Sequence, residues 1–240
     1  MRKKILLILP LLLFAITQQL QAVTCNWGYC NSVVNDQFGS VNKGKGAIYI
    51  PAEISKMYEG KQLSYVRVGL AAKAKTVKVF VTKDLNGEYI TTRTQRDQLS
   101  GFNEIKFAEP WTIDGEGFYI GYEFESDDYA LGSSTMYNEN GCWADLGDGW
   151  KNYAVEDHAL ALSIQAKISG DDLPKDYWLF CSNDILAEAG KPFNINFSIR
   201  NMGTAIGRRF QVAYSIDGGE EVTEEIKQTL GQDMEKDFSI

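Results

Sequence analysis

The sequence contains a single histidine, His158, among its 240 residues. A catalytic triad or a histidine-based metal site would therefore depend on this side chain. His158 follows Glu156 and Asp157 and starts a stretch with apolar residues at every second position, the usual setting of a histidine on a half-exposed strand. The sequence has no nucleophile-elbow, zinc-protease or P-loop motif. We expect no catalytic residues, and paired carboxylates for glycoside cleavage are the alternative left open.

Two acidic loops place oxygen ligands next to glycines, a pattern suited to calcium. They are Asp114-Gly115-Glu116-Gly117 and Asp145-Leu146-Gly147-Asp148-Gly149. Calcium binds about six to eight oxygen atoms, and glycine lets the backbone turn tightly enough to add carbonyl ligands. Neither loop has the spacing of an EF-hand, so an acidic turn between strands is the competing interpretation. The candidate calcium ligands are Asp114, Glu116, Asp145 and Asp148.

The longest polar segment, from about Ser126 to Tyr153, combines aromatic rings with amide side chains. Sugar rings stack on aromatic rings, while their hydroxyls form hydrogen bonds with amides and carboxylates. This mixture predicts a shallow ligand-binding site, although tryptophans in such a loop also serve to cover the end of a core. The candidate ligand-binding residues are Tyr137, Asn138, Asn140, Trp143 and Trp150.

The four cysteines, Cys25, Cys30, Cys142 and Cys181, form an even set. In an exported chain such a set predicts disulfides, and four cysteines allow three pairings that sequence alone does not distinguish. One pairing joins Cys25 to Cys30 and Cys142 to Cys181. Zinc is the competing interpretation, but no second cysteine or histidine pair completes a tetrahedral site.

The N-terminus has the layout of a secretory signal peptide. Arg2-Lys3-Lys4 precedes an apolar run from Ile5 to Ile16, too short to span a bilayer, and Ala22 occupies the expected cleavage position. We expect residues 1–22 to be removed and the protein to be secreted, to a cell surface or a periplasm. The formal net charge of −8 opposes binding to nucleic acid phosphates. No later segment is apolar enough to predict a membrane span.

Apolar residues recur at every second position along most of the chain, which predicts strands with one face toward a core. In the strand expected over residues 118–125, the apolar residues share one face and Tyr119, Gly121 and Glu123 share the other. Asn86-Gly87 predicts a hairpin turn, and residues 52–60 a short helical turn. The inward faces are predicted to comprise Val66, Val68 and Leu70; Val77, Val79 and Val81; Phe118, Ile120, Tyr122 and Phe124; and Leu160, Leu162, Ile164, Ala166 and Ile168.

The polar segment Gly170-Asp171-Asp172-Leu173-Pro174 interrupts this pattern. We therefore expect an all-β protein with a jelly-roll β-sandwich over residues 23–170 and a second β-sandwich over residues 171–240. Only about five strands fit in the second module before Ile240, fewer than the roughly seven strands of a complete sandwich domain of this size. We expect the second module to be truncated and the chain to be part of a longer protein.

The second segment resembles the bacterial cell-adhesion-related (CARDB-type) Ig-like domains. The resemblance covers about Asp176 to Ile240 and rests on Phe193-Asn194-Ile195-Asn196-Phe197-Ser198-Ile199-Arg200-Asn201-Met202-Gly203, Phe210-Gln211-Val212-Ala213-Tyr214-Ser215-Ile216-Asp217-Gly218-Gly219 and Thr229-Leu230-Gly231. It implies an Ig-like sandwich used as a spacer, docking or adhesion unit, with no catalytic residues.

The first segment resembles the galactose-binding-like jelly rolls of surface proteins from Bacteroidetes-type bacteria, including the cleaved-adhesin modules. The resemblance rests on Trp27-Gly28-Tyr29-Cys30, Tyr119-Ile120-Gly121-Tyr122, Asp148-Gly149-Trp150 and the last strand to Ile168. It implies adhesion or glycan binding at a cell surface, often with calcium. The sequence thus predicts a secreted or surface-attached, non-catalytic binding protein with a glycan or an extracellular protein as partner. The alternative is an accessory N-terminal region of a longer exported protease or glycosidase.

Overall fold

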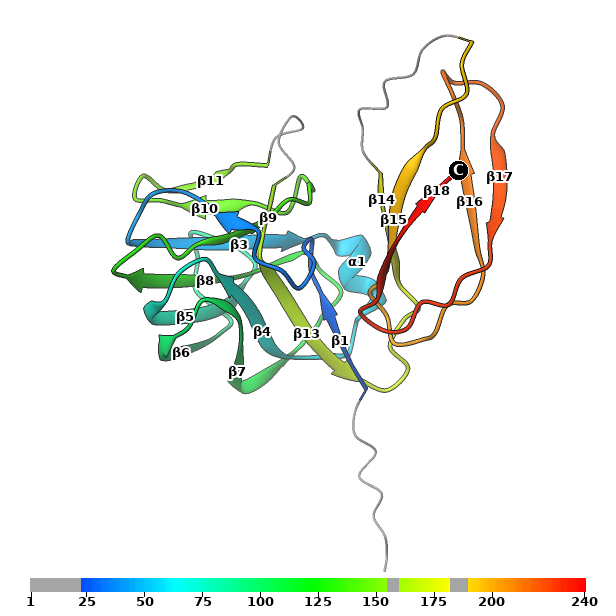
Figure 1. The fold of residues 1–240 in the computed structure, drawn as a ribbon. Helices are drawn as coiled ribbons and strands as arrows, with labels where there is room; N and C mark the ends of the chain where they lie inside the picture. Colours follow the sequence, from blue (N-terminus) through cyan, green and yellow to red (C-terminus); the bar gives the residue numbers. More distant parts are fainter. Residues whose placement is uncertain (1–22, 155–159, 182–189) are drawn as a thin grey trace, which may run out of the picture.

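The computed structural model describes residues 23–154, 160–181 and 190–240 (Figure 1). This part of the chain is all-β, with eighteen strands and one short helix, α1 (Ala52–Met57). The predicted fold class is therefore confirmed, and so is the helical turn. The expected signal peptide and His158 lie outside the described residues. Within those residues, no helix is long and apolar enough to cross a membrane.

The first part of the chain forms two antiparallel sheets that enclose one apolar core. The four-stranded sheet has the order β1 (Val23–Trp27), β13 (Ile164–Gly170), β4 (Gln62–Leu70) and β7 (Gly101–Thr112). The six-stranded sheet has the order β11 (Trp150–Asn152), β10 (Trp143–Asp145), β3 (Lys43–Ile50), β8 (Phe118–Ser126), β5 (Ala74–Thr82) and β6 (Thr91–Gln98). A small third sheet consists of β12 (Ala161–Leu162), β9 (Gly132–Ser134) and β2 (Asp36–Gln37).

The residues predicted to face inward line this core from both large sheets. Val66 and Val68 of β4 and Val79 of β5 are completely buried, as the alternation of side chains along a strand requires. Leu160 packs against the core but is only partly buried. Two sheets packed face to face form a β-sandwich; its assignment to the jelly rolls stays a prediction.

The segment from Ser126 to Tyr153, expected to be one long loop, contains three short strands. β9 pairs with β2 and β12, β10 pairs with β3, and β11 pairs with β10. Ala144 is completely buried and faces the core, while Trp143 and Asp145 on either side of it face outward. These strands are only three residues long, so each has too few positions to show an alternating pattern.

The connection between β5 and β6 is longer than the hairpin that Asn86-Gly87 predicts, because it takes up residues 83–90. The hydroxyl of Thr82 lies 2.6 Å from the carbonyl oxygen of Asp84 and 3.1 Å from that of Glu88. Since Thr82 is completely buried, these contacts hold both ends of the connection close to the sheet. The connection therefore folds back over the outer face of β5.

The second sandwich consists of a three-stranded and a two-stranded sheet. The strands are β14 (Tyr177–Cys181), β15 (Asn196–Asn201) and β18 (Glu235–Ser239), and β16 (Phe210–Tyr214) with β17 (Val222–Ile226). In the described residues its core has Phe197, Ile199 and Leu230 as buried side chains, and the apolar residues packed around them are partly buried. Its assignment to the Ig-like domains stays a prediction.

The two sandwiches are in direct contact. β13 ends at Gly170 and β14 starts at Tyr177, so the predicted break in the strands is present. Leu173 between them and Met202 after β15 are nevertheless buried in the core of the first sandwich. Trp178 of β14 stacks on Trp27 of β1, with 6.5 Å between ring centroids. Figure 1 shows the second sandwich next to α1 and β1.

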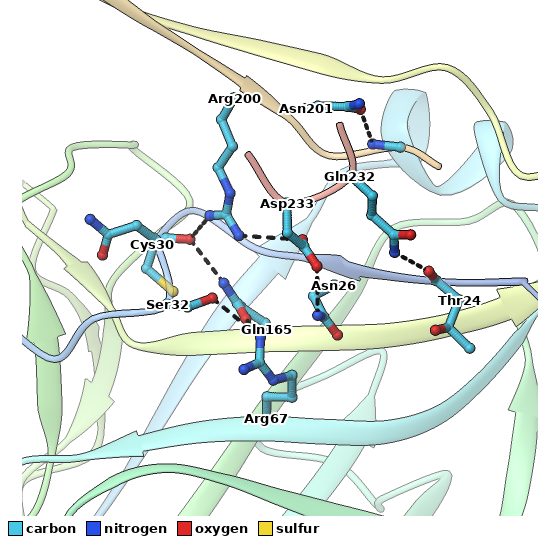
Figure 2. Close-up of polar contacts among 12 residues, drawn as sticks. Thr24, Asn26, Cys30, Ser32, Arg67, Gln165, Arg200, Asn201, Gln232 and Asp233 are labelled. Atoms are coloured by element: carbon cyan, nitrogen blue, oxygen red, sulfur yellow. Dashed lines mark hydrogen bonds and ion pairs between the residues drawn. The ribbon is translucent and has the colours of Figure 1, made fainter. Parts of the chain in front are cut away.

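A buried arginine connects the two sandwiches (Figure 2). Arg200 of β15 is 1% exposed. Its guanidinium donates a hydrogen bond to the carbonyl oxygen of Cys30 in the first sandwich and lies 3.8 Å from the carboxylate of Asp233. Asp233 in turn accepts a hydrogen bond from the amide of Asn26 on β1, at 3.1 Å. A buried charge is tolerated only when it has polar partners. One partner of Arg200, the carbonyl oxygen of Cys30, belongs to the first sandwich, although Arg200 itself belongs to the second.

A second polar contact across the junction involves Asp176, in the connection between the sandwiches. Its carboxylate accepts hydrogen bonds from the indole N–H of Trp27 (3.0 Å) and the hydroxyl of Tyr58 (3.1 Å). Burial, and then the neighbouring Cys25 and Asp176, raise the pKa of Tyr58, so its hydroxyl stays protonated and able to donate. The connection is thus bound to the first sandwich by side chains on both β1 and the turn after α1.

The disulfides predicted from the sequence are not formed. Cys25, Cys30 and Cys142 are buried thiols. Cys30 lies 3.6 Å from the carbonyl oxygen of Ile164, whereas Cys25 faces the core from β1, so the short sequence separation does not bring the two sulfurs together. Cys142 is buried in the first core, whereas Cys181 is an exposed residue of the second sandwich. Sequence spacing cannot show on which side of the backbone a sulfur lies.

We predict that replacing Arg200 destabilises the protein. Arg200→Met keeps much of the side-chain volume but removes the charge and the hydrogen bond to Cys30. We expect the free energy of unfolding, measured in urea, to fall by about 1–3 kcal/mol. The matched control is Arg209→Met, because Arg209 is exposed and paired with Glu225 at 3.6 Å; its effect should stay below about 0.5 kcal/mol. Equal effects of the two substitutions would contradict the role given to Arg200.

We also predict that three thiols are protected in the folded protein. Burial raises the pKa of Cys25, Cys30 and Cys142 to about 12 in each case, which keeps the thiols protonated at neutral pH. The test uses a Cys181→Ser variant without reductant. A thiol reagent should react only slowly with the folded protein in buffer, and it should react with all three thiols once the protein is unfolded in guanidinium. Fewer than three reactive thiols after unfolding would show that a disulfide forms.

Candidate binding face

The outer face of the six-stranded sheet is unusually rich in aromatic side chains. Directly opposed residues of neighbouring strands point to the same side of a sheet. Three such rows cross the outer face of β3, β8 and their neighbours. They comprise Tyr49 and Tyr119; Trp143, Ala47, Gly121 and Phe80; and Trp150, Asp145, Lys45, Glu123 and Lys78.

Phe80 lies at the centre of this face and is completely buried, although it points away from the main core. Its ring lies over Gly121, where an added Cβ atom would be only 2.6 Å from Cζ of Phe80. Tyr89, from the connection that folds back over β5, stacks on Phe80 with 4.4 Å between centroids, and Trp150 approaches its edge at 6.2 Å. A glycine at position 121 is therefore required for this packing.

The surrounding rings form a continuous, half-buried surface. Tyr49 and Tyr119 have centroids 4.8 Å apart, and Tyr119 packs edge-on against Trp143 at 5.6 Å. We call the set Tyr49, Phe80, Tyr89, Tyr119, Trp143 and Trp150 the aromatic face. Apart from Phe80, each of these residues is only partly buried, so a ligand can reach the rings.

A row of charged side chains crosses the sheet beside these rings. We call Asp145, Lys45, Glu123 and Lys78 the charged row; it runs over β10, β3, β8 and β5. Glu123 lies 4.0 Å from the ammonium of Lys45 and 3.7 Å from that of Lys78, and it accepts a hydrogen bond of 2.7 Å from Tyr89. Burial, and then Glu123, raise the pKa of Tyr89, so its hydroxyl remains a donor at neutral pH.

The structure brings together some of the predicted ligand-binding residues. Trp143 and Trp150 both lie on the aromatic face, but Asn138 and Asn140 do not. The side-chain oxygen of Asn138 accepts the backbone N–H of Asn140 at 2.9 Å, which shapes the turn before β10. The backbone carbonyl oxygen of Asn140 accepts the N–H of Tyr49 at 2.9 Å, so Asn140 helps to hold the loop before β10 against β3. Tyr137 lies in the connection between β9 and β10 and is partly buried.

Four residues of the aromatic face were not among the candidates from the sequence: Tyr49, Phe80, Tyr89 and Tyr119. The available signal was an aromatic residue at an outward position of a strand, as at Tyr119 beside Gly121 and Glu123. Tyr89 could not be found this way, because it reaches the sheet only through the path of the connection after β5.

In the described residues, no three histidine, cysteine or acidic side chains come together, so the calcium site stays a prediction. Lys83 lies 2.6 Å from the carboxylate of Asp114 and 3.5 Å from that of Glu116. Asp148 is paired with Lys151. The carboxylate of Asp145 accepts the backbone N–H groups of Gly147 and Gly149. In both loops the candidate carboxylates already have a lysine or backbone N–H groups as partners.

A separate hollow of about 540 Å³ lies between the Ser32–Gln37 segment and Ser100–Phe102. The one ring that lines it belongs to Phe102, and the guanidinium of Arg67 lies 5.1 Å from the centroid of that ring. None of the candidate ligand-binding residues lines it. We place the candidate site on the aromatic face instead, because several half-exposed rings meet polar groups there.

Comparison with known proteins gives no further assignment: no family model, no curated protein and no solved structure matches this chain. The two family resemblances therefore stay predictions.

We predict a pH-dependent contribution from the pair of Lys83 and Asp114. Partial burial of Asp114 acts in the opposite direction, but the hydrogen bonds from Lys83 and from the backbone of Glu116 lower the pKa of its carboxyl below the usual 3.8. Such a group stabilises the fold above its unfolded pKa, and this stabilisation is lost as the pH falls through the folded pKa. Wild type should therefore be more stable than Lys83→Gln at neutral pH, and this difference should shrink below about pH 4. A difference that stays constant in acid, measured by urea unfolding, would contradict this role.

Proposed function

We propose that this protein is an exported, non-catalytic binding or adhesion protein that recognises a glycan or an extracellular protein through its aromatic face. The observation that carries the proposal is the continuous surface of half-exposed rings from Tyr49 to Trp150 on the outer side of the six-stranded sheet. Export rests on the signal-peptide pattern of residues 1–22. Location at a bacterial surface or in the periplasm rests on the two family resemblances.

The position of these rings favours recognition over simple packing. Outward positions of a sandwich strand normally carry polar residues that meet water. Here the outward positions of three neighbouring strands carry Tyr49, Tyr119 and Trp143. Phe80 and Leu85 belong to a small buried cluster on this face. The rings that surround the cluster remain partly exposed to solvent, so packing on the cluster does not account for all of their surface. Partly exposed aromatic residues beside hydrogen-bonding groups are typical of recognition surfaces.

The junction leaves this face open in the described part of the chain. The hydrogen bonds and ring contacts between the two sandwiches come from β1, Tyr29, Cys30, Tyr58 and the connection around Asp176. None of them involves a residue of the aromatic face. The second sandwich is thus attached through a different surface of the first, consistent with a role as a spacer or docking unit.

We predict that Trp143→Ala and Trp150→Ala each weaken ligand binding about tenfold or more, since truncating a central aromatic residue of a binding surface costs about 1.4–2 kcal/mol or more. Residues 23–240 would be tested against a panel of glycans and extracellular matrix proteins, and affinities measured by calorimetry. The matched control is Tyr65→Ala, on the four-stranded sheet, where the ring has Lys106 and Lys167 near its face.

Two outcomes would contradict the proposal. The first is a correctly folded protein that binds nothing on the panel. The second is a ligand whose affinity is unchanged by both tryptophan substitutions but reduced by Tyr65→Ala. Urea unfolding of each variant separates loss of binding from loss of the fold.

A further inference from the structure

The charged row has a regular order of acceptors and donors. Asp145 is opposite Lys45, Lys45 is opposite Glu123, and Glu123 is opposite Lys78. Carboxylates and ammonium groups therefore alternate across four adjacent strands. The next pair of opposed residues on β3 and β8, Lys43 and Glu125, again combines opposite charges.

From this order we infer that the ligand of the aromatic face is a neutral glycan, whose hydroxyl groups are bound by the charged row while its ring faces stack on Trp143 and Trp150. This inference rests on the proposed function and adds the chemical class of the ligand.

The charges of the charged row cancel. The charged row contains two lysines and two carboxylates, and Glu123 lies within 4.0 Å of both ammonium groups. An anionic ligand would have to compete with Glu123 for the lysines, and it would approach a chain whose formal net charge is −8. A cationic ligand would meet both lysines. The row therefore gives neither kind of ion a net attraction.

The alternation of donors and acceptors in the charged row matches the hydrogen bonding of sugar hydroxyl groups. A sugar hydroxyl both donates and accepts a hydrogen bond, whereas a carboxylate only accepts and an ammonium only donates. A row in which the two alternate can satisfy neighbouring hydroxyls of one sugar ring in both senses. The ammonium of a paired lysine still has further N–H groups to offer, because it carries three. Hydrogen bonds that involve charged groups are also stronger than neutral ones.

The charged side chains are accessible from solvent. The side chains of Lys45 and Lys78 are each 36% exposed and that of Glu123 is 31% exposed, so their polar ends can be reached from solvent. Lys45 lies 6.0 Å from the centroid of the Trp150 ring, and Lys78 lies 4.7 Å from that of Tyr89. Polar groups and ring faces are therefore close enough for one sugar to contact both.

The test compares neutral oligosaccharides with the same backbones carrying either carboxylate (uronic acid) or sulfate groups, using residues 23–240. We expect neutral forms to bind at least about tenfold more tightly than both acidic forms. We also expect their affinity to stay within about twofold between low and high salt, since a neutral ligand has no long-range charge interaction to screen. Trp143→Ala should weaken the binding of every form.

Two substitutions test the charged row directly. Lys78→Gln should weaken neutral glycans several-fold by removing a charged donor. Glu123→Gln leaves Lys45 and Lys78 without the carboxylate between them, so it should shift the preference toward the acidic forms by about tenfold. The control is Lys106→Gln, on the four-stranded sheet. It should change neither the affinity for neutral glycans nor the preference between neutral and acidic forms.

The outcomes separate the inference from the proposed function. Tighter binding of acidic glycans by the wild type, or affinity that falls steeply with salt, would overturn the neutral ligand while leaving the aromatic face as the binding site. Binding of a matrix protein alone, with loss in Trp143→Ala, would also overturn the glycan and keep the site. Binding of nothing at all would overturn both.

Discussion

The antiparallel register of β3, β8 and β5 determines both the core and the candidate binding face. The three strands pack closely at Gly121, where a Cβ atom would lie 2.3 Å from the carbonyl oxygen of Gly46 on β3 and 2.6 Å from the ring of Phe80 on β5. If β3 slipped by one residue against β8, Ile48 would turn outward, and Lys43 and Lys45 would turn toward the core. Burying those charges would cost far more than the strands gain from pairing, so the apolar core selects a single register. The alignment of the rings and of the charged row follows from the same register.

The contact between the sandwiches is of a different physical kind. Leu173, Met202 and Trp178 extend the core of the first sandwich, beside the separate core around Phe197 and Ile199 that the described part of the second sandwich contains. Within this contact the charge of Arg200 depends on the carbonyl oxygen of Cys30 and on Asp233. Apolar burial stabilises such a contact without specifying its geometry, whereas a buried guanidinium with directional hydrogen bonds allows few arrangements. The relative orientation of the sandwiches is therefore defined mainly by the polar groups.

Some features of the fold could be predicted because they depend on neighbouring residues in the sequence. The inward residues of β4, β5 and β8 followed from period-two alternation, and α1 from a short local segment. The three strands between Ser126 and Tyr153 were missed because three residues are too few to show a period. The disulfides were predicted wrongly, because an even cysteine count carries no information on where the sulfur of Cys25 or Cys142 points. In the candidate site, Trp143 and Trp150 were found by residue type, whereas Tyr89 depends on how a connection folds over the sheet.

The sequence by itself determined that the chain is all-β, where its main strands lie and which of their faces are apolar, because hydrophobic burial acts on each strand through its own residues. It also defined a break after Gly170. Only the tertiary structure decided which strands are neighbours, and hence that Lys45, Glu123 and Lys78 form one row beside the rings of Trp143 and Tyr119. It likewise decided that a lysine balances the carboxylates of the Asp114 loop. These arrangements arise from pairing between segments far apart in the chain, where register and packing of the whole core, rather than local sequence, set the distances.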